Sequence, residues 1–173
     1  MRVLLAFIVL MIHLGPKEKD LIVNEKTISV TGNTSLGGFT CDYCDKSIGD
    51  TLVINGVQKN GDLIFDILVK EFSCGNFILN KDFRKTIKAE HYPYARIRVS
   101  NLKSRGMHYT CDLSVDLAGK KLEFKALALQ NKNRELKADL ILSFDQLELE
   151  APKKMGGLIK VDESLALEIK LGY

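Results

Sequence analysis

The 173-residue chain has no long run of basic residues, and its longest are pairs such as Lys120-Lys121 and Lys153-Lys154. Its 25 lysines and arginines exceed its 22 aspartates and glutamates by only three, and the charges alternate along the sequence instead of clustering. A nucleic-acid-binding domain usually concentrates positive charge on one face or one helix. The composition therefore argues against a nucleic-acid partner.

Residues that build catalytic centres are also scarce. The histidines are His13, His91 and His108, and the last two have no nucleophile or paired carboxylate within their own segments. The pairs Gly37-Gly38 and Gly156-Gly157 lack the Lys-Ser/Thr or the strand-to-helix context of a phosphate loop. We therefore expect no enzyme activity and predict no catalytic residue.

A metal site is not predicted either, because the four cysteines contain one C-x-x-C spacing, Cys41 to Cys44, and no second one. This pair lies in a strand-like stretch, whereas a thioredoxin-like pair opens a helix. Three positions along a strand place the two side chains on opposite faces, so a Cys41–Cys44 bond is not expected. Structural disulfides are the favoured interpretation, with a redox pair, zinc or free buried thiols as alternatives.

No apolar run reaches the roughly 20 residues that span a bilayer as a helix. Residues 2–15, RVLLAFIVLMIHLG, place one arginine before a mostly apolar run, which is typical of a secretory signal peptide. We expect residues 1–15 to direct export to the periplasm or beyond, and residues 16–173 to form one domain.

Alternation of apolar and polar residues dominates the remaining sequence. It is clearest in residues 108–117, and in residues 122–130 the apolar parity switches between Phe124 and Leu127, which predicts a β-bulge. About eight such segments, joined mostly by short turns and without a βαβ rhythm, predict an all-β antiparallel barrel. A sandwich is the alternative. The barrel is favoured chiefly because each long strand has one polar and one apolar row, as a closed sheet with an apolar interior requires, and closure also leaves no exposed edge.

One short helix is predicted between residues 80 and 89, packed against this sheet. Asn80 is the expected N-cap, Asp82 the first-turn anion, and Phe83 with Ile87 the apolar stripe. Pro93 cannot continue the helix and pushes the preceding residue towards an extended conformation.

Several short segments resemble the YceI-like family of exported, lipocalin-like bacterial barrels that bind polyisoprenoids. Asp82-Phe83, Tyr92-Pro93 and Ile97 resemble its D-F…Y-P…I/F segment. The other similar segments are Leu117-Ala118-Gly119, residues 157–161, and the cysteine-bearing stretches 39–41 and 72–76. Together they cover residues 26–172 and indicate a cysteine-bearing branch of the family.

The resemblance implies an eight-stranded lipocalin-like barrel with the helix at its mouth and a long isoprenoid chain along its axis. It also implies a Cys41–Cys74 disulfide, with Cys44–Cys111 as a less favoured second pair. The expected ligand is an apolar lipid, either a polyisoprenoid or an isoprenoid quinone, and no other cofactor is expected. A homodimer is one possible oligomeric state. The residues predicted to touch this lipid are Phe39, Phe65, Ile67, Val99, Tyr109, Leu113, Leu140, Leu142 and Phe144. The alternative is a structural or interaction module of the cell envelope whose interior is packed solid.

Overall fold

The computed structural model describes residues 20–46, 49–54, 61–106, 108–152 and 160–173. The signal peptide predicted at residues 1–15 lies outside these ranges.

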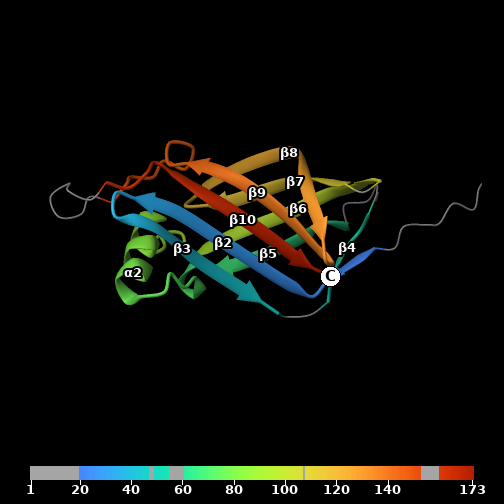
Figure 1. The fold of residues 1–173 in the computed structure, drawn as a ribbon, viewed down its shortest axis with the longest axis horizontal. Helices are drawn as coiled ribbons and strands as arrows, with labels where there is room; N and C mark the ends of the chain where they lie inside the picture. The colour runs from blue at the N-terminus through green and yellow to red at the C-terminus, as the bar shows by residue number, and fades with distance from the viewer. Residues whose placement is uncertain (1–19, 47–48, 55–60, 107, 153–159) are drawn as a thin grey trace, which may run out of the picture.

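One antiparallel sheet of eight strands forms the body of the protein, in the order β3-β2-β10-β9-β8-β7-β6-β5 (Figure 1). Its strands are β2 (Glu25–Thr34), β3 (Gly37–Asp45), β5 (Leu63–Leu68), β6 (Tyr94–Arg105), β7 (His108–Leu117), β8 (Lys120–Lys132), β9 (Glu135–Ser143) and β10 (Ser164–Gly172). A small second sheet pairs β1 (Leu21–Val23) with β4 (Asp50–Leu52). The predicted all-β antiparallel fold with eight main strands is confirmed, and the sheet curls into a half-barrel.

The inner face of the curled sheet holds the apolar core. On β2, for example, Ile28 and Val30 are buried while Ser29 and Thr31 on the outer face are only partly buried. The same alternation on β7, β9 and β10 brings apolar rows from both halves of the chain into one cluster. This is the burial pattern expected of a closed or nearly closed antiparallel sheet.

The two edge strands, β3 and β5, meet through the segment that follows β5. Asp42 and Ser73 exchange two backbone hydrogen bonds of 2.9 Å each, and Cys41 and Cys74 beside them form a disulfide. The Cys41–Cys74 pairing implied by the resemblance is therefore confirmed. Periodicity could not show this seam, because it says nothing about how the two edges of a sheet meet.

The other two cysteines are free, so the less favoured Cys44–Cys111 pairing is wrong. Cys44 is exposed on the outer face of β3, whereas Cys111 lies on the buried row of β7. The two side chains belong to opposite faces of the curled sheet and cannot meet.

Two β-bulges bend the sheet on either side of β7. The predicted one in β8 is confirmed, because the β7–β8 register shifts between Cys111 and Leu113 and Ala126 has a φ of 50°. A second bulge in β6 was not predicted, and there the register shifts between Ser100 and Lys103 around Asn101, with a φ of 52°. Bulges of this kind increase the local twist that lets a sheet curl.

The helix α2 (Phe77–Thr86) begins earlier than predicted and follows a short 3-10 turn, η3 (Val69–Glu71). Its N-cap is Asn76, whose side chain accepts a hydrogen bond from the Leu79 N–H at 2.9 Å. The prediction of Asn80 as N-cap is wrong, because Asn80 is inside the helix and its Oδ1 accepts from the Cys74 N–H at 2.6 Å. Two asparagines four residues apart satisfy the same capping pattern, and only Asn76 has the extended backbone that an N-cap requires.

The predicted apolar stripe of this helix is correct. Phe83 and Ile87 are 7% and 1% exposed, and the Phe83 ring packs on Phe72 with centroids 5.4 Å apart. In the part of the chain that the structure describes, no helix is long and apolar enough to cross a membrane.

Candidate functional site

An apolar cavity of about 370 Å³ lies at the end of the sheet that carries α2. This end, called the mouth here, also holds the turn between β2 and β3 and the connection from β9 to β10 (Figure 1). The cavity is lined by Thr34, Leu36, Gly37, Gly38, Phe39, Ile78, Leu79, Asp82, Phe83, Thr86, Ile87, Phe144, Pro152, Val161 and Leu165. We call it the mouth cavity.

The hairpin wall of the mouth cavity depends on a glycine opposite an aromatic ring. Gly32 pairs with Phe39 across β2 and β3, and a Cβ at position 32 would lie 2.6 Å from the Phe39 Cζ. The missing side chain therefore lets the ring lie against β2, where it lines the cavity. A larger residue at position 32 would displace the Phe39 ring.

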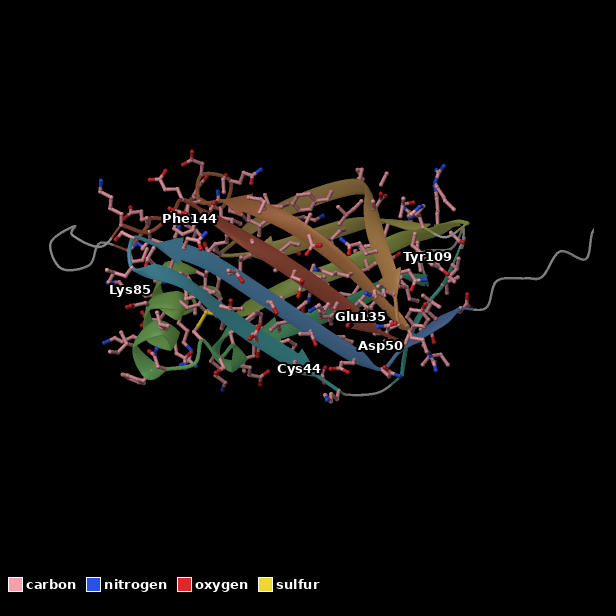
Figure 2. All side chains as sticks on the ribbon, viewed as in Figure 1. Cys44, Asp50, Lys85, Tyr109, Glu135 and Phe144 are labelled. Atoms are coloured by element: carbon pink, nitrogen blue, oxygen red, sulfur yellow. A yellow bond between two sulfur atoms is a disulfide. The ribbon has the colours of Figure 1, made fainter. Side chains whose placement is uncertain are left out.

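Phe144 supplies the opposite wall at the end of β9. Its N–H donates to the Glu163 carbonyl at 2.9 Å, and its own carbonyl accepts from the N–H groups of Leu147 and Leu149. The chain thus turns tightly around Phe144, which is 3% exposed. Figure 2 places Phe144 at the same end of the molecule as Lys85 of α2.

The helix forms the third wall and is fixed to both sides of the mouth. Arg84 Nη2 donates to the Lys70 carbonyl at 2.6 Å, and Lys88 Nζ donates to the Glu148 carbonyl at 2.7 Å. The Cys41–Cys74 disulfide holds the chain just before the helix begins. These contacts position Leu79, Phe83 and Ile87 against the space enclosed by the strands.

The mouth cavity offers an apolar environment with little ionisable chemistry. Among the described residues that line it, Asp82 is the one that carries a charge, and Thr34 and Thr86 contribute hydroxyl groups. Ligand pockets are typically apolar spaces of roughly 300–1,000 Å³ with a few polar groups. Within the described residues, no group of three or more His, Cys, Asp or Glu side chains is placed to hold a metal ion.

The opposite end of the interior, called the far end here, is packed much more closely. A void of about 10 Å³ lies there, between Val99, Cys111, Leu113, Leu129, Leu136, Ala138, Ile169 and Leu171. It holds no more than about one water molecule. The two internal spaces therefore differ greatly in size.

The nine residues predicted to contact a lipid divide into three groups. Phe39 and Phe144 line the mouth cavity, and Val99 and Leu113 line the far void. The remaining five, Phe65, Ile67, Tyr109, Leu140 and Leu142, line neither internal space. The ligand set as a whole stays a prediction.

Sequence reasoning missed most of the mouth cavity because it considered only the inward rows of the strands. Leu36 lies in a turn, Ile78 and Leu79 lie in the first turns of a helix whose start was misplaced, and Val161 precedes β10. The sequence signal that could have indicated the helix wall of this cavity was the apolar pair Phe77-Ile78 directly after the N-cap residue Asn76.

A buried lysine closes the far end. Lys26 is 5% exposed on the inner row of β2, and its Nζ lies 2.5 Å from Asp50 Oδ2 and 5.3 Å from the centroid of the Phe65 ring. A second carboxylate, that of Asp45, lies 3.9 Å away. The Lys26–Asp50 ion pair joins β4 to the main sheet. The sequence signal for a buried lysine was its position in phase with the inward-facing Ile28 and Val30.

Comparison with known proteins identifies the fold. No protein-family model matches the chain, and no curated protein sequence matches it significantly. A polyisoprenoid-binding domain from Saccharophagus degradans, implicated in plant cell wall breakdown, superposes with a TM-score of 0.60 at 13% identity, covering 86% of this chain and 97% of that one. BcnA from Burkholderia cenocepacia superposes with a TM-score of 0.51 at 11% identity, covering 84% and 94%. The fold expected from the YceI-like resemblance is therefore confirmed.

Proposed function

We propose that this protein binds the apolar chain of an isoprenoid-type lipid, which enters through the mouth cavity. The observation that carries the proposal is a cavity of about 370 Å³ with almost entirely apolar walls, in a fold shared with a polyisoprenoid-binding domain. Burial of an apolar chain there would supply about 25 cal/mol per Å² of surface removed from water. We infer a binding protein rather than an enzyme, because the described residues of the lining include no nucleophile paired with a base.

The depth that the ligand reaches follows from the two internal spaces. The mouth cavity accepts the first part of a chain, whereas the void of about 10 Å³ at the far end accepts none of it without side-chain movement. A long chain along the whole axis therefore requires the packed residues between them to rearrange. A shorter segment held at the mouth requires no such change.

Export to the periplasm or the cell exterior fits this proposal. The Cys41–Cys74 disulfide is of the kind that persists in oxidising compartments. A carrier or sequestering role in the cell envelope would place the mouth cavity near membranes that contain isoprenoid lipids.

Calorimetric titration with farnesol, a short isoprenoid alcohol, tests the proposal directly. We expect saturable binding of about one farnesol per protein, with the negative heat-capacity change of apolar burial. Leu79→Asp should weaken it about tenfold or more, because the bound chain would have to desolvate a carboxylate in the cavity wall. The matched control is Leu122→Asp, at a partly buried leucine that packs on the core but does not line the cavity.

Extraction of the protein purified from its native host, followed by mass spectrometry, tests the length of the chain. We expect a near-stoichiometric isoprenoid from the wild type. Leu140→Ser, on the inner row of β9, should reduce recovery of a chain that passes beyond the mouth and spare one that stays there. Absence of both farnesol binding and extracted lipid would replace this proposal with the packed structural module, which the close packing of the far end favours.

A further inference from the structure

Exposed apolar side chains gather beside the mouth cavity. The large apolar residues that are exposed within the described ranges are Ile22, Leu36, Ile64, Phe77, Ile78, Tyr92, Tyr94 and Ile141. Leu36 and Phe77 are each 78% exposed and Ile78 is 67% exposed, and Leu36 and Ile78 also line the cavity. Single exposed apolar residues are ordinary, but a group at the opening of an apolar cavity indicates an interaction surface.

The outward face of α2 adds positive charge to this group. At 100° per residue, Phe77, Ile78, Lys81 and Lys85 share one side of the helix, opposite the buried Phe83 and Ile87. All four are exposed, and the acidic residue of the helix, Asp82, lies at the edge of this face, about 40° beyond Ile78, where it lines the cavity. Neither Lys81 nor Lys85 forms an ion pair with a described residue.

We propose that Leu36, Phe77, Ile78, Lys81 and Lys85, the docking rim, rest on the surface of an anionic lipid bilayer. The mouth cavity can then exchange its ligand directly with the membrane. This inference rests on the proposed function, because it names the partner from which the same cavity is loaded.

The chemistry of the docking rim fits a bilayer surface. An interfacial helix inserts aromatic and aliphatic side chains below the headgroups while its lysines contact anionic lipid phosphates. The connection from β9 to β10, which is hydrogen-bonded to the end of β2 next to Leu36, has an excess of negative charge among its described residues. It carries Asp145, Glu148, Glu150, Asp162 and Glu163 against the single basic residue Lys160, and Glu148 is paired with Lys120. An anionic surface would repel this connection and attract the two lysines of α2, so the helix side of the mouth would turn towards the bilayer.

Contact between the docking rim and the bilayer would shorten the aqueous path that an apolar chain must cross to reach the cavity. A long isoprenoid is nearly insoluble in water, so each ångström of aqueous path between membrane and cavity opposes transfer. Leu36 and Ile78 belong to both the rim and the cavity wall, so a chain leaving the bilayer would meet apolar surface throughout.

Vesicle flotation tests the inference with two lipid compositions, pure phosphatidylcholine and an equal mixture with phosphatidylglycerol. We expect the wild type to float with the anionic vesicles and much less with the neutral ones. Phe77→Ser should lower the vesicle partition constant about tenfold. Lys81→Gln/Lys85→Gln should lower binding to anionic vesicles about fivefold per lysine and leave binding to neutral vesicles unchanged.

Matched variants on other surfaces control for general changes of polarity and charge. Ile141→Ser removes a 68% exposed side chain from the outer face of β9. Lys46→Gln/Lys132→Gln removes two exposed lysines that follow β3 and end β8. Both controls should float as the wild type does.

Farnesol titration of the same variants separates this inference from the proposed function, because Phe77, Lys81 and Lys85 do not line the cavity. The wild type could bind farnesol yet fail to float, or float equally well with neutral vesicles. Either result overturns membrane docking and leaves the proposed function intact. Equal flotation of Phe77→Ser and wild type also overturns it. A change in oligomeric state of Phe77→Ser on gel filtration, with unchanged flotation, would assign the rim to a second copy of the chain instead. Loss of wild-type farnesol binding overturns the proposed function.

Discussion

Asp112 joins the two bulges. Its Oδ1 accepts from the Ala126 N–H in the β8 bulge at 2.9 Å, and its Oδ2 accepts from Asn101 Nδ2 in the β6 bulge at 2.7 Å. These two hydrogen bonds, in that order, are the main causes that hold the pKa of the Asp112 carboxyl below its ordinary value. The carboxylate thus connects three neighbouring strands at the point where the sheet bends.

Asp112→Ala should destabilise the protein by about 1–3 kcal/mol near neutral pH, because it leaves the Ala126 N–H and the Asn101 amide without this acceptor. A carboxyl with a depressed folded-state pKa stabilises the protein above its unfolded-state pKa, and this contribution is lost as pH falls through the folded-state value. Urea unfolding at pH near 7 and at about pH 3 should therefore show a smaller difference between variant and wild type at acid pH.

Asp116→Ala is the control for this prediction. Asp116 lies on the same face of β7, and its carboxylate makes no hydrogen bond to either bulge. A loss of stability in Asp112→Ala that is the same at both pH values would contradict the role assigned to the ionised carboxylate.

Among the elements, α2 is held to the sheet mainly through its buried stripe. Ile87→Ala should lower the free energy of unfolding by about 2–5 kcal/mol, since truncation of a side chain that is 1% exposed leaves a cavity. Circular dichroism should still report the strands. Ile141→Ala, at an isoleucine 68% exposed, should change the free energy by less than about 0.5 kcal/mol. Equal urea midpoints for the two variants would mean that Ile87 does not anchor the helix.

Sequence reasoning succeeded where one element determines its own pattern. The parity switch between Phe124 and Leu127 predicted the β8 bulge, and Phe83 with Ile87 predicted the buried side of α2. β6 contains the same kind of switch, from Val99 to Leu102, at its own bulge. The predicted helix start is wrong because Asn76 and Asn80 offer the same capping side chain. The extended backbone of Asn76 and the hydrogen bond from the Cys74 N–H to Asn80 distinguish them only in the folded chain.

At the scale of the whole molecule, the sequence could not predict which parts of the interior are empty. Inward rows of apolar residues look the same whether side chains fill the axis or surround a ligand. The mouth cavity arises because a glycine, a hairpin turn and a helix from distant parts of the chain enclose a space that no strand defines alone. The seam between β3 and β5 is likewise a property of the assembled sheet.

That seam predicts a large effect of the disulfide on the whole fold. Cys41→Ala/Cys74→Ala should lower the free energy of unfolding by about 3–4 kcal/mol in the chain-entropy model for a separation of 33 residues. Hydrogen exchange at the Asp42 and Ser73 amides should accelerate, because their reciprocal bonds would then hold the seam without the covalent link. Cys44→Ser, at the exposed free thiol, is the control and should change neither quantity. Wild-type exchange rates in the double alanine variant would contradict the role of the disulfide at the seam.

The two free thiols differ in exposure, so their rates of chemical modification can report opening of the sheet. Cys44 is open to solvent, whereas Cys111 is 2% exposed, and burial, with the neighbouring Asp112 as the second cause, raises the pKa of its thiol to about 12. A bulky thiol reagent can therefore modify Cys44 in the native state but reaches Cys111 only when the strands around it separate. Each modified thiol adds the mass of one reagent molecule to the protein. The delay between the first and the second addition, followed by mass spectrometry, would measure how often the sheet opens. This readout needs no fluorescent residue, which suits a chain that has no tryptophan.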